Sequence, residues 1–310
     1  MKRIGITGAT GFIGLALTKR WAARADIVPI VRNPQSDLTA AIAIGDINGE
    51  TNWTPAVSGL DVIVHCAGRA HVLKEQEVDP LEAFRVVNVE ATTKLAEDAI
   101  AAGVRRLVFL SSVGVMGDPQ DRDGLLRLTD SPLPTNAYSV SKLEAEKALR
   151  RVEASSDLEV VIVRPPLVYG PGAPANFQRF VNILGKGIPL PLGRVSALRS
   201  FVGIENLSEF LWLCTSARAA AGRTFFVSDG DDLSTADLAR LIAKHLGVPA
   251  RLLPVPPSWL RMAGKLVGRT GDVERLLSNL RVDLSANMQI LGWQPAHSTE
   301  DQITNALLKP

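Results

Sequence analysis

The sequence predicts a doubly wound α/β fold, with helices on both faces of a parallel sheet, followed by a smaller C-terminal domain. Short apolar strand patterns alternate with helical patterns through the first half of the chain, which is typical of a parallel sheet. A glycine-rich turn joins the first strand to a helix, and 310 residues are enough for a large domain with a smaller partner. We place the first domain at residues 1–165, with part of 200–230 returning to it, and the second mainly at 166–310.

The composition is that of a soluble globular protein, with 46% hydrophobic and 21% charged residues. The net charge of +2 predicts no nucleic-acid partner. The two cysteines, Cys66 and Cys214, stand among apolar neighbours and indicate buried thiols in a reducing compartment. No apolar targeting stretch precedes the first strand, and no window has 18 uninterrupted apolar residues, so we expect a cytoplasmic protein without membrane insertion.

The first strand pattern, residues 4–7, runs into the turn GATGFIG at residues 8–14, and an apolar helix follows. A strand, a glycine turn and a helix start are the context in which glycines indicate a dinucleotide site. Gly8 permits the tight turn, Gly11 lets the backbone approach a pyrophosphate, and Gly14 allows close helix packing. Unpaired N–H groups at the helix N-terminus would then face the phosphates.

The glycine spacing is GxxGxxG rather than GxGxxG. In this respect the chain resembles the short-chain dehydrogenase/reductase superfamily, and within it the extended branch, the NAD-dependent epimerase/dehydratase family, which acts on nucleotide sugars. The resemblance covers nearly the whole chain. It implies a Rossmann-type first domain that binds a dinucleotide and a C-terminal domain that binds a nucleotide sugar.

The second strand pattern, residues 27–31, contains Pro29, which we expect near the strand start or at an irregularity. It ends at Arg32, a position that commonly distinguishes the two nicotinamide dinucleotides. A carboxylate there would bind a ribose hydroxyl of NAD, whereas an arginine can pair with the 2′-phosphate of NADP. The sequence therefore favours NADP(H). NAD(H) and a solvated Arg32 are the alternatives.

Two further strand patterns follow, at residues 41–47 and 61–68, and the second ends in the small-residue turn Cys66-Ala67-Gly68. The resemblance implies that the first of these segments holds the adenine and that the second lies against the cofactor.

A long helical pattern covers residues 81–102 and contains Asn88. Asparagine is mildly unfavourable inside a helix, so we expect it to have a hydrogen-bonding role, which the resemblance places in support of the active site. His71, on the loop before this helix, is given no catalytic role.

The predicted catalytic residues follow the next strand pattern, residues 106–110. Ser112 comes just after it, and Tyr138 and Lys142 stand four positions apart in a helical pattern, on one face. A phenol has a pKa of about 10, which a nearby ammonium would lower. The resemblance implies that Tyr138 moves the proton, Lys142 tunes Tyr138 and binds the nicotinamide ribose, and Ser112 donates a hydrogen bond to the reacting oxygen.

Two departures from relatives bear on the reaction. Sugar-nucleotide 4,6-dehydratases carry extra acid and base carboxylates in the segment after the strand, but here no carboxylate precedes Asp118, so dehydration is disfavoured. Sugar 4-epimerases often carry an aromatic residue at the position of Met116, which weakens the epimerase interpretation.

The second half is more irregular. After the strand pattern at 160–163, Tyr169 lies in a Pro/Gly-rich loop and is a candidate either for lining a pocket or for stiffening a linker. The resemblance implies that Asn176 contacts the substrate and that Arg199 binds its diphosphate. The amphipathic helical pattern at 259–267 is interpreted as packing on the core rather than on a membrane.

The leading functional prediction is a 4-ketoreductase that reduces a UDP-4-keto-6-deoxy-N-acetylhexosamine at C4 for surface-polysaccharide (lipopolysaccharide) synthesis. A UDP-hexose 4-epimerase is the close alternative, and a non-catalytic dinucleotide sensor is the second. The partner would be a UDP-linked sugar, a homodimer is left open, and no metal site is predicted. Substrate contacts are expected at Ser112, Asn176 and Arg199. Cofactor contacts are expected at Gly8, Gly11, Phe12, Ile13, Gly14, Arg32, Asp46, Ile47, Cys66, Ala67, Gly68, Asn88, Tyr138, Lys142 and Pro165.

Overall fold

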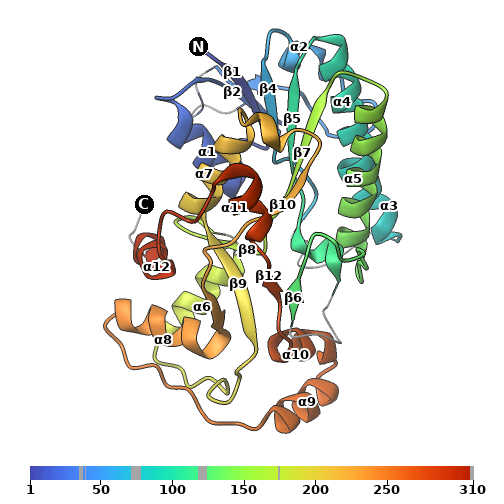
Figure 1. Cartoon of the computed structure of the whole chain (residues 1–310). Helices are drawn as coiled ribbons and strands as arrows, with labels where there is room; N and C mark the ends of the chain where they lie inside the picture. The colour runs from blue at the N-terminus through green and yellow to red at the C-terminus, as the bar shows by residue number, and fades with distance from the viewer. Residues whose placement is uncertain (35–37, 39, 71–77, 118–123, 174, 308–310) are drawn as a thin grey trace.

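A computed structural model describes the chain except for residues 35–37, 39, 71–77, 118–123, 174 and 308–310, and except for the side chains of residues 175 and 176 (Figure 1). His71 and Asp118 therefore lie outside the described residues.

The central element is a sheet of seven parallel strands, as predicted for a Rossmann-type fold. The direction of strand addition reverses between β1 and β4, and ligands of such sheets bind beyond the strand ends at this switch point. In spatial order the strands are β3 (Ile42–Ala43), β2 (Asp26–Val31), β1 (Arg3–Thr7), β4 (Val62–His65), β5 (Arg106–Leu110), β7 (Glu159–Arg164) and β10 (Thr224–Phe226).

Helices cover both faces of this sheet, because the strands are apolar on both sides (Figure 1). One face packs against α1 (Phe12–Trp21), α7 (Ile204–Cys214) and α11 (Ser285–Leu291). The other packs against α2 (Thr54–Val57), α4 (Ala91–Ala101) and α5 (Ala137–Ala154). Since α7 and β10 come late in the chain, residues 204–226 contribute to the layers of the N-terminal sheet.

Two small sheets lie in the remainder of the chain. One has the order β11-β9-β8, and the other pairs β12 with β6. Their strands are β6 (Leu125–Leu126), β8 (Leu167–Tyr169), β9 (Leu198–Gly203), β11 (Asp232–Ser234) and β12 (Arg281–Val282). The other helices are α3 (Pro80–Arg85), α6 (Ala175–Gly185), α8 (Thr235–His245), α9 (Pro257–Leu266), α10 (Thr270–Leu277) and α12 (Thr299–Leu307), with 3-10 turns at Val113–Met116 and Arg218–Ala220.

Pro29 lies in the middle of β2, not near its start, and this expectation was wrong. Val31 accepts a hydrogen bond from the Ile44 N–H on the β3 side, and alternate residues of a strand point the same way, so the Pro29 nitrogen also points there. β3 pairs only with Ile30 and Val31, so no ladder bond is lost. β3 itself is two residues long, shorter than the predicted strand over 41–47.

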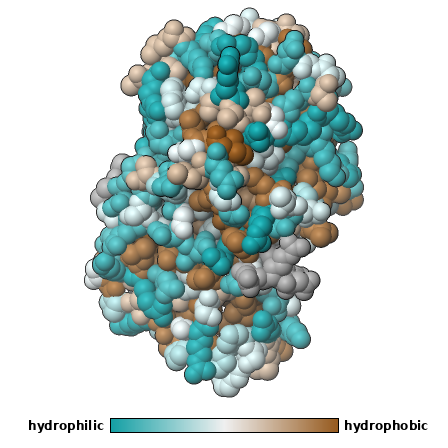
Figure 2. Space-filling model, in the orientation of Figure 1, coloured by the Kyte–Doolittle hydropathy of each residue, from teal (hydrophilic) through white to brown (hydrophobic). Residues whose placement is uncertain are grey.

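The predicted amphipathic helix exists as α9, but the prediction that it packs on the core was wrong. Gly264 is its buried residue, and Trp259, Met262 and Leu266 are exposed. Elsewhere, the face shown in Figure 2 mixes small groups of hydrophobic residues with hydrophilic ones. Within the described part of the chain, no helix is long and apolar enough to cross a bilayer.

Candidate active site

The predicted catalytic helix is α5, and it begins where its capping chemistry dictates. The Asn136 side chain accepts a hydrogen bond from the Ser139 N–H at 2.9 Å, which caps the first turn. Tyr138 and Lys142 then stand one turn apart, as the spacing predicts. The same helix turns Lys142 toward the sheet, where it is only 5% exposed.

The Ser112 hydroxyl lies close enough to the Tyr138 phenol to lower its pKa. Ser112 follows β5 and also caps the 3-10 turn, since its oxygen accepts from the Gly114 N–H at 3.1 Å. The Tyr138 ring lies edge-on to Phe84, with centroids 6.0 Å apart. The strand end and the helix therefore bring together two of the three predicted catalytic side chains.

Burial raises the pKa of Tyr138 to about 12, and the Ser112 hydroxyl opposes this rise. Lys142 is not among the causes of this shift, and its tuning of the Tyr138 pKa stays a prediction. The shift follows from removing the phenolate from water.

The Lys142 ammonium lies over the Phe109 ring, with Nζ 4.3 Å from the centroid. Burial lowers its pKa to about 8, and the nearby Cys66 and Glu146 partly oppose this. Gly68 also comes close: a Cβ built on it would lie 3.6 Å from Lys142 Nζ. Phe109 is a contact that sequence reasoning missed, because its position in an apolar strand marks it only as core.

Asn88 has the hydrogen-bonding role that its place in a helix suggested. It lies in a π-helical turn, Val86–Glu90, between α3 and α4, and such turns are frequent at functional sites. Its Nδ2 donates to Ser141 Oγ at 2.9 Å and to the Arg69 carbonyl at 3.1 Å, and its Oδ1 accepts from the Arg69 N–H at 2.8 Å. Asn88 thus joins α5 to the loop that follows β4.

The glycine turn has the geometry that a pyrophosphate requires. Gly8 has φ of +66°, and a Cβ on it would lie 2.9 Å from the Ala67 backbone. Gly11 caps α1 without a side-chain bond, and the first turn of α1 has no acidic residue, so its N–H groups can receive an anion. These residues, together with the small-residue loop after β4, fit a dinucleotide.

Gly14→Ala is expected to weaken dinucleotide binding by tenfold or more. The added Cβ would lie 2.2 Å from the Gly8 carbonyl oxygen, so the glycine turn must move away from α1. Fluorescence titration with NAD⁺ and NADP⁺ measures the loss. Gly247→Ala, at a glycine with open space around it but φ of +67°, is a control for general destabilisation. Equal affinity in Gly14→Ala and the wild type would contradict the assignment.

The two other segments that are predicted to contact the cofactor lie beside each other. The Arg32 carbonyl accepts a hydrogen bond from the Gly45 N–H at 3.0 Å, which brings the end of β2 next to Asp46. Both Arg32 and Asp46 have exposed side chains, whereas Ile47 packs against the sheet. A cation and a carboxylate are thus both present where the two dinucleotides differ.

A buried network holds the end of β4. His65 lies between Thr7 Oγ1, 2.7 Å from Nδ1, and Thr92 Oγ1, 2.9 Å from Nε2. Thr7 Oγ1 in turn accepts from the Ala67 N–H at 3.1 Å. Burial lowers the pKa of His65 to about 3 and raises that of the Cys66 thiol to about 12, so both are neutral. They shape the predicted cofactor loop without charge.

Met116 is buried, and its sulfur accepts a hydrogen bond from Arg164 Nη1 at 3.1 Å. Arg164 also pairs with Glu146 through two hydrogen bonds, at 2.9 and 2.5 Å. Pro165, next along the chain, accepts from the Val113 N–H at 2.9 Å and so fixes the turn after Ser112. Met116 therefore packs in the core, and its lack of an aromatic ring is weak evidence against an epimerase.

The two other predicted substrate contacts, Asn176 and Arg199, lie on α6 and β9. Arg199 Nη1 donates to the carbonyls of Arg275 and Ser278, at 2.6 and 3.1 Å, at the end of α10. Asn176 is in the first turn of α6, and its side chain is not described. Tyr169 is buried and donates to Asp229 at 2.7 Å, so it anchors the core and does not line a pocket.

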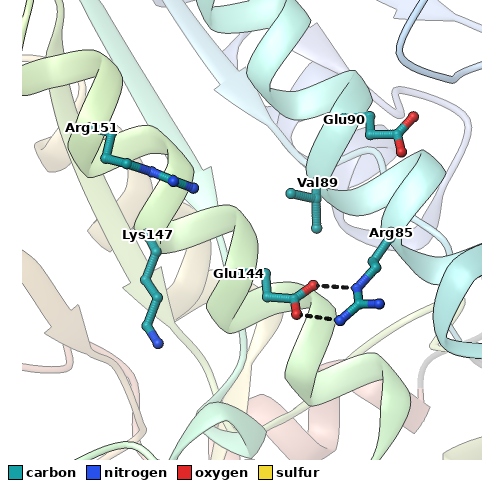
Figure 3. Close-up of a pocket in the computed structure, with 6 residues that line it drawn as sticks. All are labelled: Arg85, Val89, Glu90, Glu144, Lys147 and Arg151. Atoms are coloured by element: carbon teal, nitrogen blue, oxygen red, sulfur yellow. Dashed lines mark hydrogen bonds and ion pairs between the residues drawn. The ribbon is translucent and has the colours of Figure 1, made fainter.

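A separate pocket of about 370 Å³ lies between α5 and the helical segment before α4 (Figure 3). Arg85 and Glu144 join its two sides through a two-pronged ion pair, with both distances 2.8 Å. It shares no residue with the Ser112–Tyr138–Lys142 group. Its lining residues are Arg85, Val89, Glu90, Glu144, Lys147 and Arg151. Among the described residues, no cluster of His, Cys, Asp and Glu could hold a metal ion.

The parallel sheet and its glycine turn define a Rossmann-type dinucleotide enzyme of the short-chain dehydrogenase/reductase class. Residues 4–227 match the NAD dependent epimerase/dehydratase family, and the chain belongs to this family. It is 40% identical to a UDP-glucose 4-epimerase of Vibrio cholerae over 304 residues, 97% of this chain and 93% of the relative. It is 27% identical to a dTDP-L-rhamnose 4-epimerase of Burkholderia thailandensis, over 96% of this chain and 92% of that one.

Solved structures have the same fold. The UDP-glucuronic acid 4-epimerase from Bacillus cereus in complex with NAD superposes with a TM-score of 0.78 at 19% identity, covering 98% of this chain and 94% of that one. MoeE5 in complex with UDP-glucose and NAD gives a TM-score of 0.77 at 23% identity, covering 98% and 97%. At these identities the likeness establishes the fold.

Proposed function

We propose that this enzyme is a UDP-hexose 4-epimerase that works with NAD(H). The observation that carries the proposal is the 40% identity to a UDP-glucose 4-epimerase across 97% of the chain. This similarity favours the alternative over the predicted 4-ketoreductase. The absence of a carboxylate between Ser112 and Asp118 still argues against a dehydratase.

In this proposal Tyr138 takes the proton from the C4 hydroxyl of the sugar and later returns it to the same oxygen, after the sugar has turned its opposite face toward the hydride donor. Ser112, which lowers the Tyr138 pKa, donates to the same sugar oxygen and stabilises charge that develops there. Lys142 holds positive charge beside the phenol and binds the nicotinamide ribose. When bound, the dinucleotide accepts and returns the hydride at C4.

NAD(H) is proposed because the structural relatives named above were solved with NAD. The exposed Asp46 carboxylate, adjacent to the end of β2, is available for a ribose hydroxyl. Arg32 favours the second candidate, the 4-ketoreductase, since an enzyme that consumes a reductant in every turnover is suited to NADPH.

One pair of assays separates the two candidates. Incubation with UDP-glucose and catalytic NAD⁺ is expected to form the C4 epimer, UDP-galactose, which chromatography of the products detects. The absorbance at about 340 nm, which reports NADH, should show no net change. A parallel reaction contains NADPH and an enzymatically generated UDP-4-keto-6-deoxy-N-acetylhexosamine. Stoichiometric NADPH oxidation there, with no epimer formed from UDP-glucose, UDP-glucuronic acid or their N-acetylated analogues, would overturn the epimerase proposal.

A further inference from the structure

Helix α9 presents an apolar face to solvent. Trp259, Met262 and Leu266 recur at helical spacing and are 64%, 58% and 81% exposed, and Val267, at the end of the helix, is 69% exposed. Isolated exposed apolar residues are ordinary, but four on one short helix form a contiguous strip. We call these four residues the α9 strip.

The helix is held so that this strip faces outward. Its one buried residue, Gly264, packs against α10, where a Cβ would lie 2.7 Å from Val273 Cγ2. The Gly264 carbonyl accepts from the Arg269 N–H at 2.8 Å, and Arg261 pairs with Glu274 at 3.0 Å. Figure 1 shows α9 at the end of the molecule farthest from the seven-stranded sheet. A broad surface can therefore reach the strip.

Basic residues predominate in the sequence around the strip. Residues 238–271 contain no Asp or Glu but have basic side chains at Arg240, Lys244, Arg251, Arg261, Lys265 and Arg269, in a protein whose net charge is only +2. Three of these cations form ion pairs, Arg240 with Asp237, Lys244 with Glu300 and Arg261 with Glu274. Lys265 is exposed on the turn after Arg261, beside the apolar face, and Arg269 is exposed just past the helix. A partner for this surface must accept apolar side chains and supply negative charge.

We propose that α9 is a peripheral docking helix for an anionic phospholipid bilayer. Amphipathic helices with Trp and Leu on one face and Lys and Arg beside it lie in the plane of the lipid headgroups. In this position the strip would enter the acyl boundary, while Lys265 and Arg269 meet lipid phosphates. The 10 residues of α9 extend about 15 Å, half of a bilayer core, so the helix lies on the membrane and does not span it.

A second copy of the chain is a poorer occupant. In a two-fold symmetric contact the strip would meet itself and bring the two basic edges together. Helix α10, on which α9 packs, carries the carboxylates Asp272 and Glu274, and Glu274 already pairs with Arg261. Repulsion between the uncompensated cations would oppose such a dimer, whereas an anionic bilayer neutralises them.

The test is flotation of the full-length protein with vesicles of phosphatidylcholine alone or with 30 mol% phosphatidylglycerol. The wild type is expected to float with the anionic vesicles, less so as salt is raised. Trp259→Ser/Leu266→Ser is expected to weaken binding by about a hundredfold, because it removes two buried apolar side chains. Lys265→Gln/Arg269→Gln is expected to weaken it by about thirtyfold, at about 1 kcal/mol for each cation.

Ile188→Ser/Met288→Ser, at exposed apolar positions outside the strip, is the matched control and should bind like the wild type. Turnover of a soluble UDP-sugar without vesicles should be equal in all variants. Three results would overturn the proposal: a wild type that stays with the soluble fraction, equal flotation of the strip variant, or a strip variant whose only defect is lost self-association in sedimentation velocity.

Discussion

Tyr138→Phe is expected to lower kcat by about 10³-fold while leaving dinucleotide affinity within about twofold of the wild type. The substitution removes the hydroxyl that, in the proposed function, moves the proton at C4, and whose pKa Ser112 lowers. The ring, packed edge-on to Phe84, is retained. Initial rates of epimer formation and a fluorescence titration with NAD⁺ check the two parts.

The chain contains one other tyrosine, which supplies a matched control. Tyr169→Phe removes a buried hydroxyl that donates to Asp229, so it should lower thermal stability. Asp229 would still accept from Asn206 at 2.7 Å and from the Gly203 N–H at 2.9 Å, so the fold should persist with near-normal kcat. If Tyr138→Phe keeps the wild-type kcat, or if Tyr169→Phe loses as much of its kcat, then the assignment of Tyr138 as the proton carrier is contradicted.

The fold was predictable because its signals are local. The glycine turn after an apolar strand, and the alternation of strand and helix patterns that follows it, can each be recognised within short stretches of sequence. The seven parallel strands confirm the predicted sheet. The relation of Tyr138 to Lys142 is likewise local, since one helix fixes it. Asn88 was identified by its unfavourable place in a helix, though its π-helical turn was not.

The errors have nonlocal causes. The environment of Lys142 depends on Phe109 beneath it and on Gly68 beside it, so its low pKa follows from tertiary burial, not from helix spacing. The periodicity of apolar residues in α9 is the same whether its apolar face meets a core or solvent. The packing of Gly264 on α10 determines that this face is exposed. The error on Met116 also has a nonlocal cause. Its place in the sequence after β5 suggested a position that bears on the reaction, but its sulfur contacts Arg164 in the core.

Lys142→Met is expected to abolish measurable epimerisation, a loss of about 10³-fold or more, and at the same time to raise the melting temperature. In the proposed function the ammonium acts beside the phenol and binds the nicotinamide ribose, but in the folded chain it is buried against Phe109. Burial without a paired carboxylate lowers its pKa from 10.5 to about 8, so the charged form is disfavoured on folding. Methionine fills similar space without that penalty, as expected where function opposes stability.

The pH dependence gives a sharper test than the melting temperature at one pH. Between about pH 8 and 10.5 the unfolded chain keeps the Lys142 proton while the folded chain releases it. Unfolding therefore takes up a proton, and the contribution of Lys142 to the free energy of unfolding increases with pH through this window. Below about pH 8 Lys142 is charged in both the folded and the unfolded chain, and the free-energy cost of burying its charge is present in full. The free energy of unfolding of Lys142→Met should thus exceed that of the wild type most below pH 8, and the two values should converge toward pH 10.

Thermal melts of both proteins at pH 7, 8, 9 and 10, without added dinucleotide, measure this difference. Lys147→Met is the matched control, since Lys147 is exposed on the same helix. Its melting temperature should run parallel to that of the wild type at every pH. If Lys142→Met melts lower than the wild type at pH 7, or if the gap between them is independent of pH, then Lys142 does not carry a buried charge. In that case its role beside Tyr138 must rest on packing instead.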